Sequence, residues 1–117
     1  MDLLAQTLRL LREHGIRPSR RLGQSFLVDG ALADRMVGYL DPRPADTVLE
    51  IGAGLGALTE RLAGRCSRVI AVEVDGRLAA ILRERFSGTN VEVVEGDILE
   101  MELPRVDKVI SNVPYPI

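Results

Sequence analysis

The chain has 117 residues, enough for one domain with a hydrophobic core but short for a complete doubly wound enzyme. Its net charge of -2 excludes an overall basic field of the kind that marks many nucleic-acid-binding proteins. A single cysteine, Cys66, excludes an internal disulfide, and we expect a buried or idle thiol there and not a nucleophile. The sequence carries no zinc-type spacing, no apolar leader and no stretch near the roughly 18 apolar residues of a membrane span, so we expect a cytoplasmic protein without a metal.

Residues 1–28 are predicted to form a short amphipathic helix followed by a basic flap. Leucines at positions 4, 8 and 11 recur at helical spacing over residues 2–14. His14 is expected to be no more than a residue of the last helical turn. The flap holds several arginines and leads into Phe26 and Leu27, and two interpretations fit it equally. It is either a solvated linker whose apolar end enters the core, or a flap beside a ligand site that also contacts phosphates.

Beyond the flap, short apolar runs alternate with helical patterns. Strands are expected over residues 47–51, 68–73, 91–94 and 107–111. Helices are expected from Asp29 to before Pro42, around Leu58 and Leu62 up to Gly64, and from Asp75 to before Gly88. This alternation implies right-handed crossovers and a parallel sheet, hence an α/β fold for residues 29–117.

The first expected strand runs directly into three glycines spaced by two, Gly52, Gly54 and Gly56. Glycine permits a positive φ and lets a ligand approach the main chain, while the helix that follows offers unpaired N–H groups. This pattern predicts a nucleotide-type pocket at the carboxyl end of the first strand. Gly52, Gly54 and Ala57 also satisfy the dinucleotide-binding fingerprint, with Glu73 about twenty residues further on. The glycines therefore leave two cofactor classes open.

Polar residues follow the other strands at the same edge of the sheet. Glu73 ends the second strand, Asp97 follows the third and Asn112 follows the fourth. Ligands of open α/β sheets lie outside the carboxyl ends of the strands, so we expect these residues to converge on one crevice. Taken singly, Glu73 could equally well be a surface acid at a strand end as a ligand-binding residue. Asp97 could equally well be a turn residue beside Gly96. Glu50 is a carboxylate within a buried strand, and we expect an arginine or backbone amides to satisfy it while it supports the glycine turn.

The tetrapeptide Asn112-Val113-Pro114-Tyr115 distinguishes between the two cofactor classes. An exocyclic adenine amine attacks well only as its nitrogen becomes tetrahedral, because its lone pair is delocalised into the ring. The Asn112 carboxamide oxygen and the Pro114 carbonyl could accept its two N–H bonds and favour that geometry. Tyr115 could stack on the face of the base. By itself, the tetrapeptide is explained better as a proline-ended strand with a packed tyrosine than as a site for an amine. Because it follows an edge that is already expected to bind a nucleotide, we favour the interpretation as a site for the adenine amine.

Together these motifs resemble those of the ribosomal RNA adenine N6,N6-dimethyltransferases. The resemblance runs from around Arg20 to the end of the chain and rests on Gly23–Leu27, Glu50–Gly56, Glu73–Asp75, Gly96-Asp97 and Asn112–Tyr115. It implies S-adenosyl-L-methionine as methyl donor and a Rossmann-like class I methyltransferase fold, with a parallel sheet and flanking helices. Related enzymes that methylate large-subunit ribosomal RNA share most of these motifs, so the RNA target is less narrowly defined than the reaction.

The resemblance also implies roles for residues along the edge of the sheet. Cofactor contacts are implied for Gln24, Ser25, Leu27, Gly52, Gly54, Glu73, Asp97 and Asn112, and contacts with the target base for Asn112, Pro114 and Tyr115. Glu73 would accept hydrogen bonds from the ribose hydroxyls and Asp97 from the adenine amino group. Gly52 and Gly54 would pass close to the methionyl part.

Members of this family continue beyond the point where this chain ends. The resemblance therefore implies an N-terminal part, truncated after the fourth strand, without the later strands and the helical RNA-binding domain. We expect this part alone to be inactive and the longer protein to dimethylate N6 of adenosines in ribosomal RNA during ribosome biogenesis. The expected target is the pair of adjacent adenosines near the 3′ end of the small-subunit RNA, and the expected partner is the small-subunit precursor. The alternatives are a non-catalytic RNA-binding assembly factor of the same fold and an NAD-dependent dehydrogenase.

Overall fold

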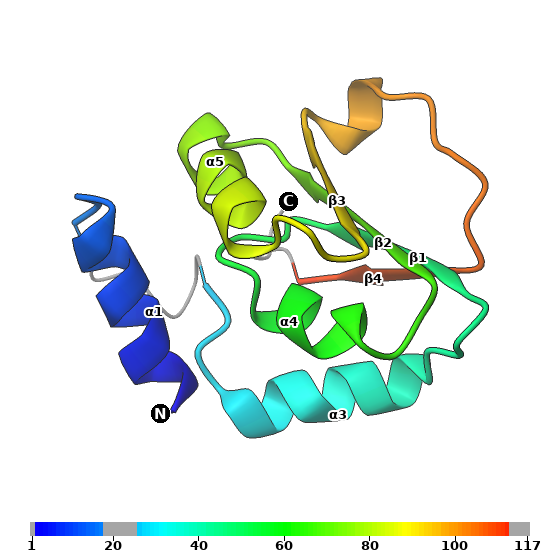
Figure 1. The fold of residues 1–117 in the computed structure, drawn as a ribbon, viewed down its shortest axis with the longest axis horizontal. Coiled ribbons are helices and arrows are strands. Elements are labelled where there is room, and N and C mark those ends of the chain that lie inside the picture. The colour runs from blue at the N-terminus through cyan, green and yellow to red at the C-terminus, as the bar shows by residue number, and fades with distance from the viewer. Residues whose placement is uncertain (1, 18–25, 113–117) are drawn as a thin grey trace.

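A parallel sheet of four strands forms the centre of the molecule (Figure 1). The structure is a computed structural model that describes residues 2–17 and 26–112. The strands lie in the order β3-β2-β1-β4 and comprise β1 (Thr47–Ile51), β2 (Arg68–Glu73), β3 (Val91–Glu95) and β4 (Lys108–Ser111). The helices are α1 (Leu3–Glu13), α3 (Gly30–Leu40), α4 (Ala57–Ala63), α5 (Gly76–Arg85) and the 3-10 turn η1 (Ile98–Glu100). The predicted strands are confirmed, with ends that differ by one residue at β3 and β4.

Aspartate side chains begin most of these helices, because a carboxylate can accept hydrogen bonds from the unpaired N–H groups of a first turn. Asp29 accepts from the amide of Leu32 at 3.1 Å at the start of α3. Asp75 accepts from the amide of Arg77 at 2.8 Å at the start of α5. Both residues therefore act as the caps that the sequence predicts.

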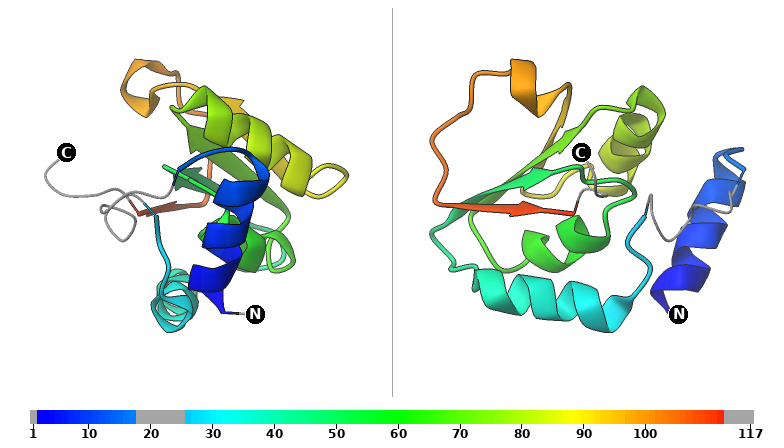
Figure 2. Two further views of the ribbon diagram at one scale, coloured as in Figure 1. Left: turned by 90° about the vertical axis from the view of Figure 1, so that its left-hand side faces the viewer. Right: turned by 180° about the vertical axis from the view of Figure 1, so that it is seen from behind.

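The two faces of the sheet are covered differently. On one face, buried side chains of β1, β2 and β4 pack against α3 and α4, and Ala71 packs against Leu82 of α5. On the other face, Leu49, Ile70 and Val72 form a cluster with Ile51 and Val94 of the sheet and with hydrophobic residues of η1 and the connection that follows it. The view from behind in Figure 2 shows these strands with no helix of the described residues in front of them. Among those residues, no helix is both long and apolar enough to cross a membrane.

Helix α1 stands beside the sheet and packs on the glycine turn. Leu10 and Leu11 form a buried cluster with Leu55 of the turn, and Phe26 packs against this cluster. Leu27 packs against the core beneath α3 and α4. The apolar end of the predicted flap thus enters the core, as one of the two interpretations expected, whereas residues 18–25 lie outside the described residues.

Gly56 provides a test of how tightly the turn is packed. Its φ of 96° is left-handed, and a Cβ there would lie 2.7 Å from Cε2 of Phe86. We expect Gly56→Ala to lower the free energy of unfolding by about 2 to 4 kcal/mol, because strain and overpacking add. Urea denaturation measures this change.

The matched control is Gly64→Ala at the other end of α4. Gly64 has a φ of −87° and open space where a Cβ would lie, so its substitution should leave stability unchanged or slightly higher. Equal denaturation midpoints for the two variants would contradict the packing of Phe86 against the turn.

Candidate functional site

The carboxylate of Glu73 joins the glycine turn to the end of β2. Its Oε1 accepts a hydrogen bond from the amide of Gly54 at 2.8 Å, and its Oε2 accepts from the amide of Asp75 at 2.9 Å. Glu73 is buried, which excludes the alternative of a surface acid. A carboxylate has about four lone-pair sites, so each oxygen that is engaged here keeps a further site for a ligand donor. The sequence placed Glu73 at this edge but did not predict that it holds the turn.

An apolar cavity of about 460 Å³ opens at the carboxyl ends of the strands. This volume lies in the range of small-molecule sites, which is about 300 to 1,000 Å³. Its lining comes from every strand end: Ile51, Gly52, Val72, Val74, Gly96, Asp97, Ile98, Leu99 and Ser111. The structure thus brings Gly52 and Asp97 together around one cavity, but Asn112 lines a different one, so the single crevice expected from the sequence is confirmed only in part. The apolar contribution of Val74, Ile98 and Leu99 was not predicted.

Asp97 serves as a turn residue as well as a member of this cavity. Its Oδ1 accepts from the amide of Leu99 at 2.9 Å and so caps η1. Both interpretations offered for Asp97 are therefore compatible with its position. The cap fixes the direction of the carboxylate at the rim of the cavity.

A second, smaller cavity of about 30 Å³ lies beneath the glycine turn. Asn112, Leu27, Gly52 and Gly54 all border it, so four predicted site residues from three separate segments meet there. Its outer wall is formed by α1, through Leu3, Gln6, Thr7 and Leu10. The space suffices for about one water molecule. Gln24, Ser25, Pro114 and Tyr115, also predicted for the site, lie outside the described residues.

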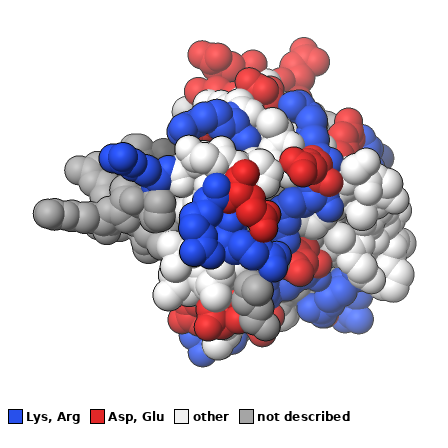
Figure 3. Space-filling view, turned by 60° about the vertical axis from the view of Figure 1, so that its left-hand side comes forward, with Lys and Arg blue, Asp and Glu red and all other residues white. Residues whose placement is uncertain are grey.

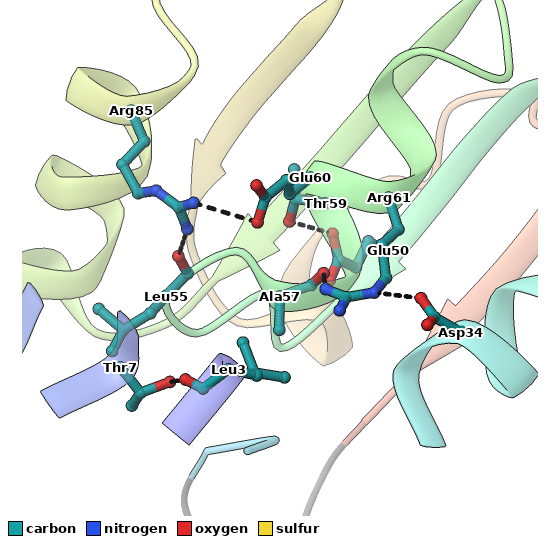
Figure 4. Close-up of polar contacts among 10 residues, drawn as sticks. All are labelled: Leu3, Thr7, Asp34, Glu50, Leu55, Ala57, Thr59, Glu60, Arg61 and Arg85. Atoms are coloured by element: carbon teal, nitrogen blue, oxygen red, sulfur yellow. Dashed lines mark hydrogen bonds and ion pairs between the residues drawn. The ribbon is translucent and has the colours of Figure 1, made fainter. Parts of the chain in front are cut away.

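Glu50 borders the same small cavity and is almost completely buried, with 1% of its surface exposed. Burial raises the pKa of Glu50 to about 8; the negative charge of Glu73 adds to this rise, and a hydrogen bond from Thr59 opposes it. That bond joins the Thr59 hydroxyl to Oε1 at 2.5 Å (Figure 4). The prediction of an arginine or backbone-amide partner is wrong, because among the described residues the donor is this hydroxyl. Thr59 lies in the first turn of α4, so the pair ties β1 to the helix across the glycine turn.

Two other titratable residues, Cys66 and His14, contact neighbouring backbone and side-chain groups of the fold. Cys66 is buried, burial raises the pKa of its thiol, and its Sγ donates to the carbonyl of Leu62. The position agrees with the predicted buried thiol. His14 ends α1 as predicted, and its ring contacts the carbonyl of Leu10 and the carboxylate of Glu84. In the part of the chain that the structure describes, no group of three or more metal-ligating side chains gathers.

Charged side chains of both signs alternate on the face that carries α1 (Figure 3). Arg9 pairs with Glu13 at 3.5 Å along the helix, which shows this mixing at close range. A mixed surface produces no strong long-range field. The charge of the described part of this face thus agrees with the low net charge of the chain.

The buried carboxyl of Glu50 predicts a pH-dependent stability. Its pKa is 4.5 in ordinary surroundings and about 8 in the folded chain, so between these values the folded state holds a proton that the unfolded state releases. The contribution of Glu50 to stability is therefore greatest below pH 4.5 and declines as the pH rises to 8. We expect Glu50→Gln, which cannot titrate, to flatten the fall in unfolding free energy between pH 5 and 8 by a few kcal/mol. Denaturation curves across this range measure it.

Glu92→Gln is the control, because Glu92 is exposed on the same sheet. It should leave the pH profile unchanged. An identical slope for Glu50→Gln and the unmodified chain would show that Glu50 does not titrate in this window.

Comparison with solved structures identifies the class of protein that this fold and site define. A phosphoethanolamine N-methyltransferase from Haemonchus contortus, solved with S-adenosylhomocysteine, superimposes with a TM-score of 0.66 at 20% identity, covering 92% of this chain and 24% of that one. The structure of the 23S rRNA methyltransferase ErmE gives a TM-score of 0.71 at 41% identity, covering 78% of this chain and 38% of that one. The parallel sheet with a glycine turn after β1 and an acid ending β2 is thus a Rossmann-like fold of the S-adenosylmethionine-dependent methyltransferases.

The chain belongs to the ribosomal RNA adenine dimethylase family, whose model matches residues 16–117. The ribosomal RNA small subunit methyltransferase A of Geobacter metallireducens is 47% identical over 116 residues, which are 92% of this chain and 42% of that protein. A probable ribosomal RNA small subunit methyltransferase A of Methanosarcina mazei is also 47% identical, over 92% of this chain and 40% of that protein. A dimethyladenosine transferase structure from Plasmodium falciparum matches with a TM-score of 0.68 at 33% identity, over 73% of this chain and 32% of that one.

These findings decide between the two cofactor classes that the glycines left open. Family membership and fold imply S-adenosyl-L-methionine and not a nicotinamide dinucleotide. The chain spans about 40% of the length of the curated relatives that it matches.

Proposed function

We propose that the intact protein transfers methyl groups from S-adenosyl-L-methionine to N6 of adenosines in ribosomal RNA. The proposed target is the pair of adjacent adenosines near the 3′ end of the small-subunit RNA, and the proposed setting is ribosome biogenesis in the cytoplasm. The observation that carries this proposal is the meeting of Asn112, Leu27, Gly52 and Gly54 around one cavity in a chain of this family. The curated relatives named for the small-subunit RNA support the choice of target.

The residues at the sheet edge fit the two ends of the cofactor. We assign the adenine ring to the 460 Å³ cavity, where Val74 and Ile98 offer apolar contacts and Asp97 an acceptor for the adenine amino group. Glu73 has lone pairs free for the ribose hydroxyls, beside the two backbone amides it already holds. Gly52 and Gly54 belong to the glycine turn and border the small cavity, where the methionyl part would approach the main chain.

Leu27 is assigned to the cofactor as well, with Gln24 and Ser25 next to it in the sequence. Leu27 and the two glycines border the same small cavity, so one side of the proposed methionyl site comes from Leu27 and another from the glycine turn.

The chemistry on the protein side is alignment and hydrogen bonding. When bound, the cofactor supplies an electrophilic sulfonium methyl group, so no nucleophilic side chain is needed. Positioning of the amine for in-line attack can lower the barrier by about 7 to 11 kcal/mol. We assign to the Asn112 carboxamide oxygen and the Pro114 carbonyl the two hydrogen bonds that draw the adenine amine toward tetrahedral geometry. Tyr115 is assigned to stacking on the unstacked base.

An RNA-binding assembly factor without catalysis remains the second candidate, because the same fold and basic segment would serve it. The presence of Asn112 at the small cavity favours catalysis over this alternative. The structural relative named as a 23S rRNA methyltransferase raises the large-subunit RNA as a competing target. Substrates from both subunits separate these cases.

The decisive measurement is transfer of radiolabelled methyl groups by the intact protein to under-methylated small and large ribosomal subunits, followed by identification of the modified nucleoside. We expect N6,N6-dimethyladenosine in the small subunit. Asn112→Ala should reduce transfer at least a hundredfold, since it removes an acceptor used in the transition state, while cofactor affinity changes less than threefold. Labelling of only the large subunit would overturn the target, and absence of labelling by the unmodified protein would overturn the proposed activity.

The ribose assignment of Glu73 is tested by calorimetry with S-adenosylhomocysteine and its 2′-deoxy analogue. The unmodified protein should prefer the ribose form by about tenfold, because a lost charged hydrogen bond costs about 1.5 kcal/mol. Glu73→Ala should bind both more weakly and lose the preference. Glu95→Ala is the control, since Glu95 is the residue paired with Glu73 on β3 and is exposed. A preference that survives in Glu73→Ala would remove Glu73 from the ribose.

A further inference from the structure

Arg85 reaches from the end of α5 to the glycine turn, thirty positions earlier in the sequence (Figure 4). Its Nη1 donates to the carbonyl oxygen of Leu55, between Gly54 and Gly56. Only 17% of its side chain is exposed. None of the motifs on which the resemblance rests includes this residue, and no sequence pattern predicted a role for it.

The turn needs an external contact at this point. Gly54 and Gly56, on either side of Leu55, have φ values of 60° and 96°. Glycine adopts positive φ values about as readily as negative ones, so neither residue by itself holds the turn in this conformation. A segment flanked by two such residues has low intrinsic stiffness, so its peptide groups are oriented by their hydrogen bonds. Glu73 orients the amide of Gly54 from the side of β2. Arg85 orients the carbonyl of Leu55 from the side of α5.

The guanidinium is itself held in place from two directions. Its Nη2 lies 3.4 Å from Oε2 of Glu60 in α4, and its central carbon lies 5.0 Å from the centre of the Phe86 ring. Both contacts suit a planar, delocalised cation. The same Phe86 ring fills the space next to Gly56, so Arg85 and Phe86 together close the outer side of the turn.

We propose that Arg85 is a positioning residue for the cofactor, which keeps the backbone of Gly52–Gly54 in its binding conformation by fixing the carbonyl of Leu55. This rests on the proposed function, because it assumes that the turn receives the methionyl part. Arg85 borders the small cavity and is already engaged by Leu55 and Glu60, so its effect is on the turn and not on the reacting atoms.

The test compares Arg85→Met, which keeps the length of the side chain without its donors, with Arg85→Lys in the intact protein. Calorimetry gives the Kd of S-adenosylhomocysteine, and methyl transfer gives kcat and the KM values for S-adenosyl-L-methionine and RNA. We expect Arg85→Met to raise the cofactor Kd and KM about tenfold, while kcat at saturating cofactor and the KM for RNA stay within twofold. Arg85→Lys should recover part of the affinity, since an ammonium can still donate to the carbonyl.

Arg83→Met is the matched control. Arg83 lies two residues earlier on α5, is exposed, and its Nη1 lies 3.9 Å from Oε1 of Glu95. It should leave the Kd, KM and kcat unchanged. A cofactor Kd of Arg85→Met equal to that of Arg83→Met would overturn the proposal, as would a fall in kcat without a change in Kd.

A merely structural role is separated by the lysine variant and by thermal unfolding. Loss of affinity that Arg85→Lys does not recover, together with an equal fall in Tm for both Arg85 variants, would assign Arg85 to stability alone and overturn the proposal. The proposed function fails on a different result, namely no methyl transfer by the unmodified protein. Calorimetric binding that responds to Arg85 in such a protein would still support the positioning role.

Discussion

The hydrogen bond from the amide of Gly54 to the carboxylate of Glu73 is the contact on which the site depends. A turn rich in glycine can adopt many conformations, and folding it into one conformation costs backbone entropy. Glu73 offsets this cost with a charge-assisted acceptor that comes from the neighbouring strand. The same carboxylate accepts a hydrogen bond from the amide of Asp75, the residue that caps α5. One side chain therefore links the turn after β1 with the turn after β2.

Much of the fold could be predicted because its signals are local. Aspartates mark the starts of α3 and α5 by accepting hydrogen bonds from backbone amides within a few residues. Prolines after α3 mark its end because proline has no N–H to continue a helix. Apolar runs in β1 and β2 identify buried parallel strands, which alternate with helices at the spacing of right-handed crossovers. The edge position of Glu73, Asp97 and Asn112 follows from this topology alone. What the predictions missed lies between segments distant in sequence.

Two buried acids illustrate that difference. Glu50 and Glu73 lie in adjacent strands, and the sequence marks Glu50 as a carboxylate that needs donors and Glu73 as an acid at the strand end. Glu73 receives two backbone amides, whereas Glu50 receives one hydroxyl from Thr59 and has its pKa raised to about 8. Nothing in the spacing of Glu50 and Thr59 shows that α4 will turn this hydroxyl toward β1. The donor depends on how a helix packs on a sheet, which is a tertiary property.

Register explains why the site forms at one level of the sheet. Ile51 is paired with Val72 on β2 and with Ser111 on β4, so the residues that follow these positions lie side by side at the carboxyl edge of the sheet. Gly52, Glu73 and Asn112 are those residues. Since successive side chains of a strand alternate between faces, a shift of one residue in either pairing would turn Glu73 or Asn112 away from the turn. The parallel pairing of β1 with both neighbours therefore brings Gly52, which is proposed to bind the methyl donor, next to Asn112, which is proposed to bind the target amine. The glycine motif alone would not do this.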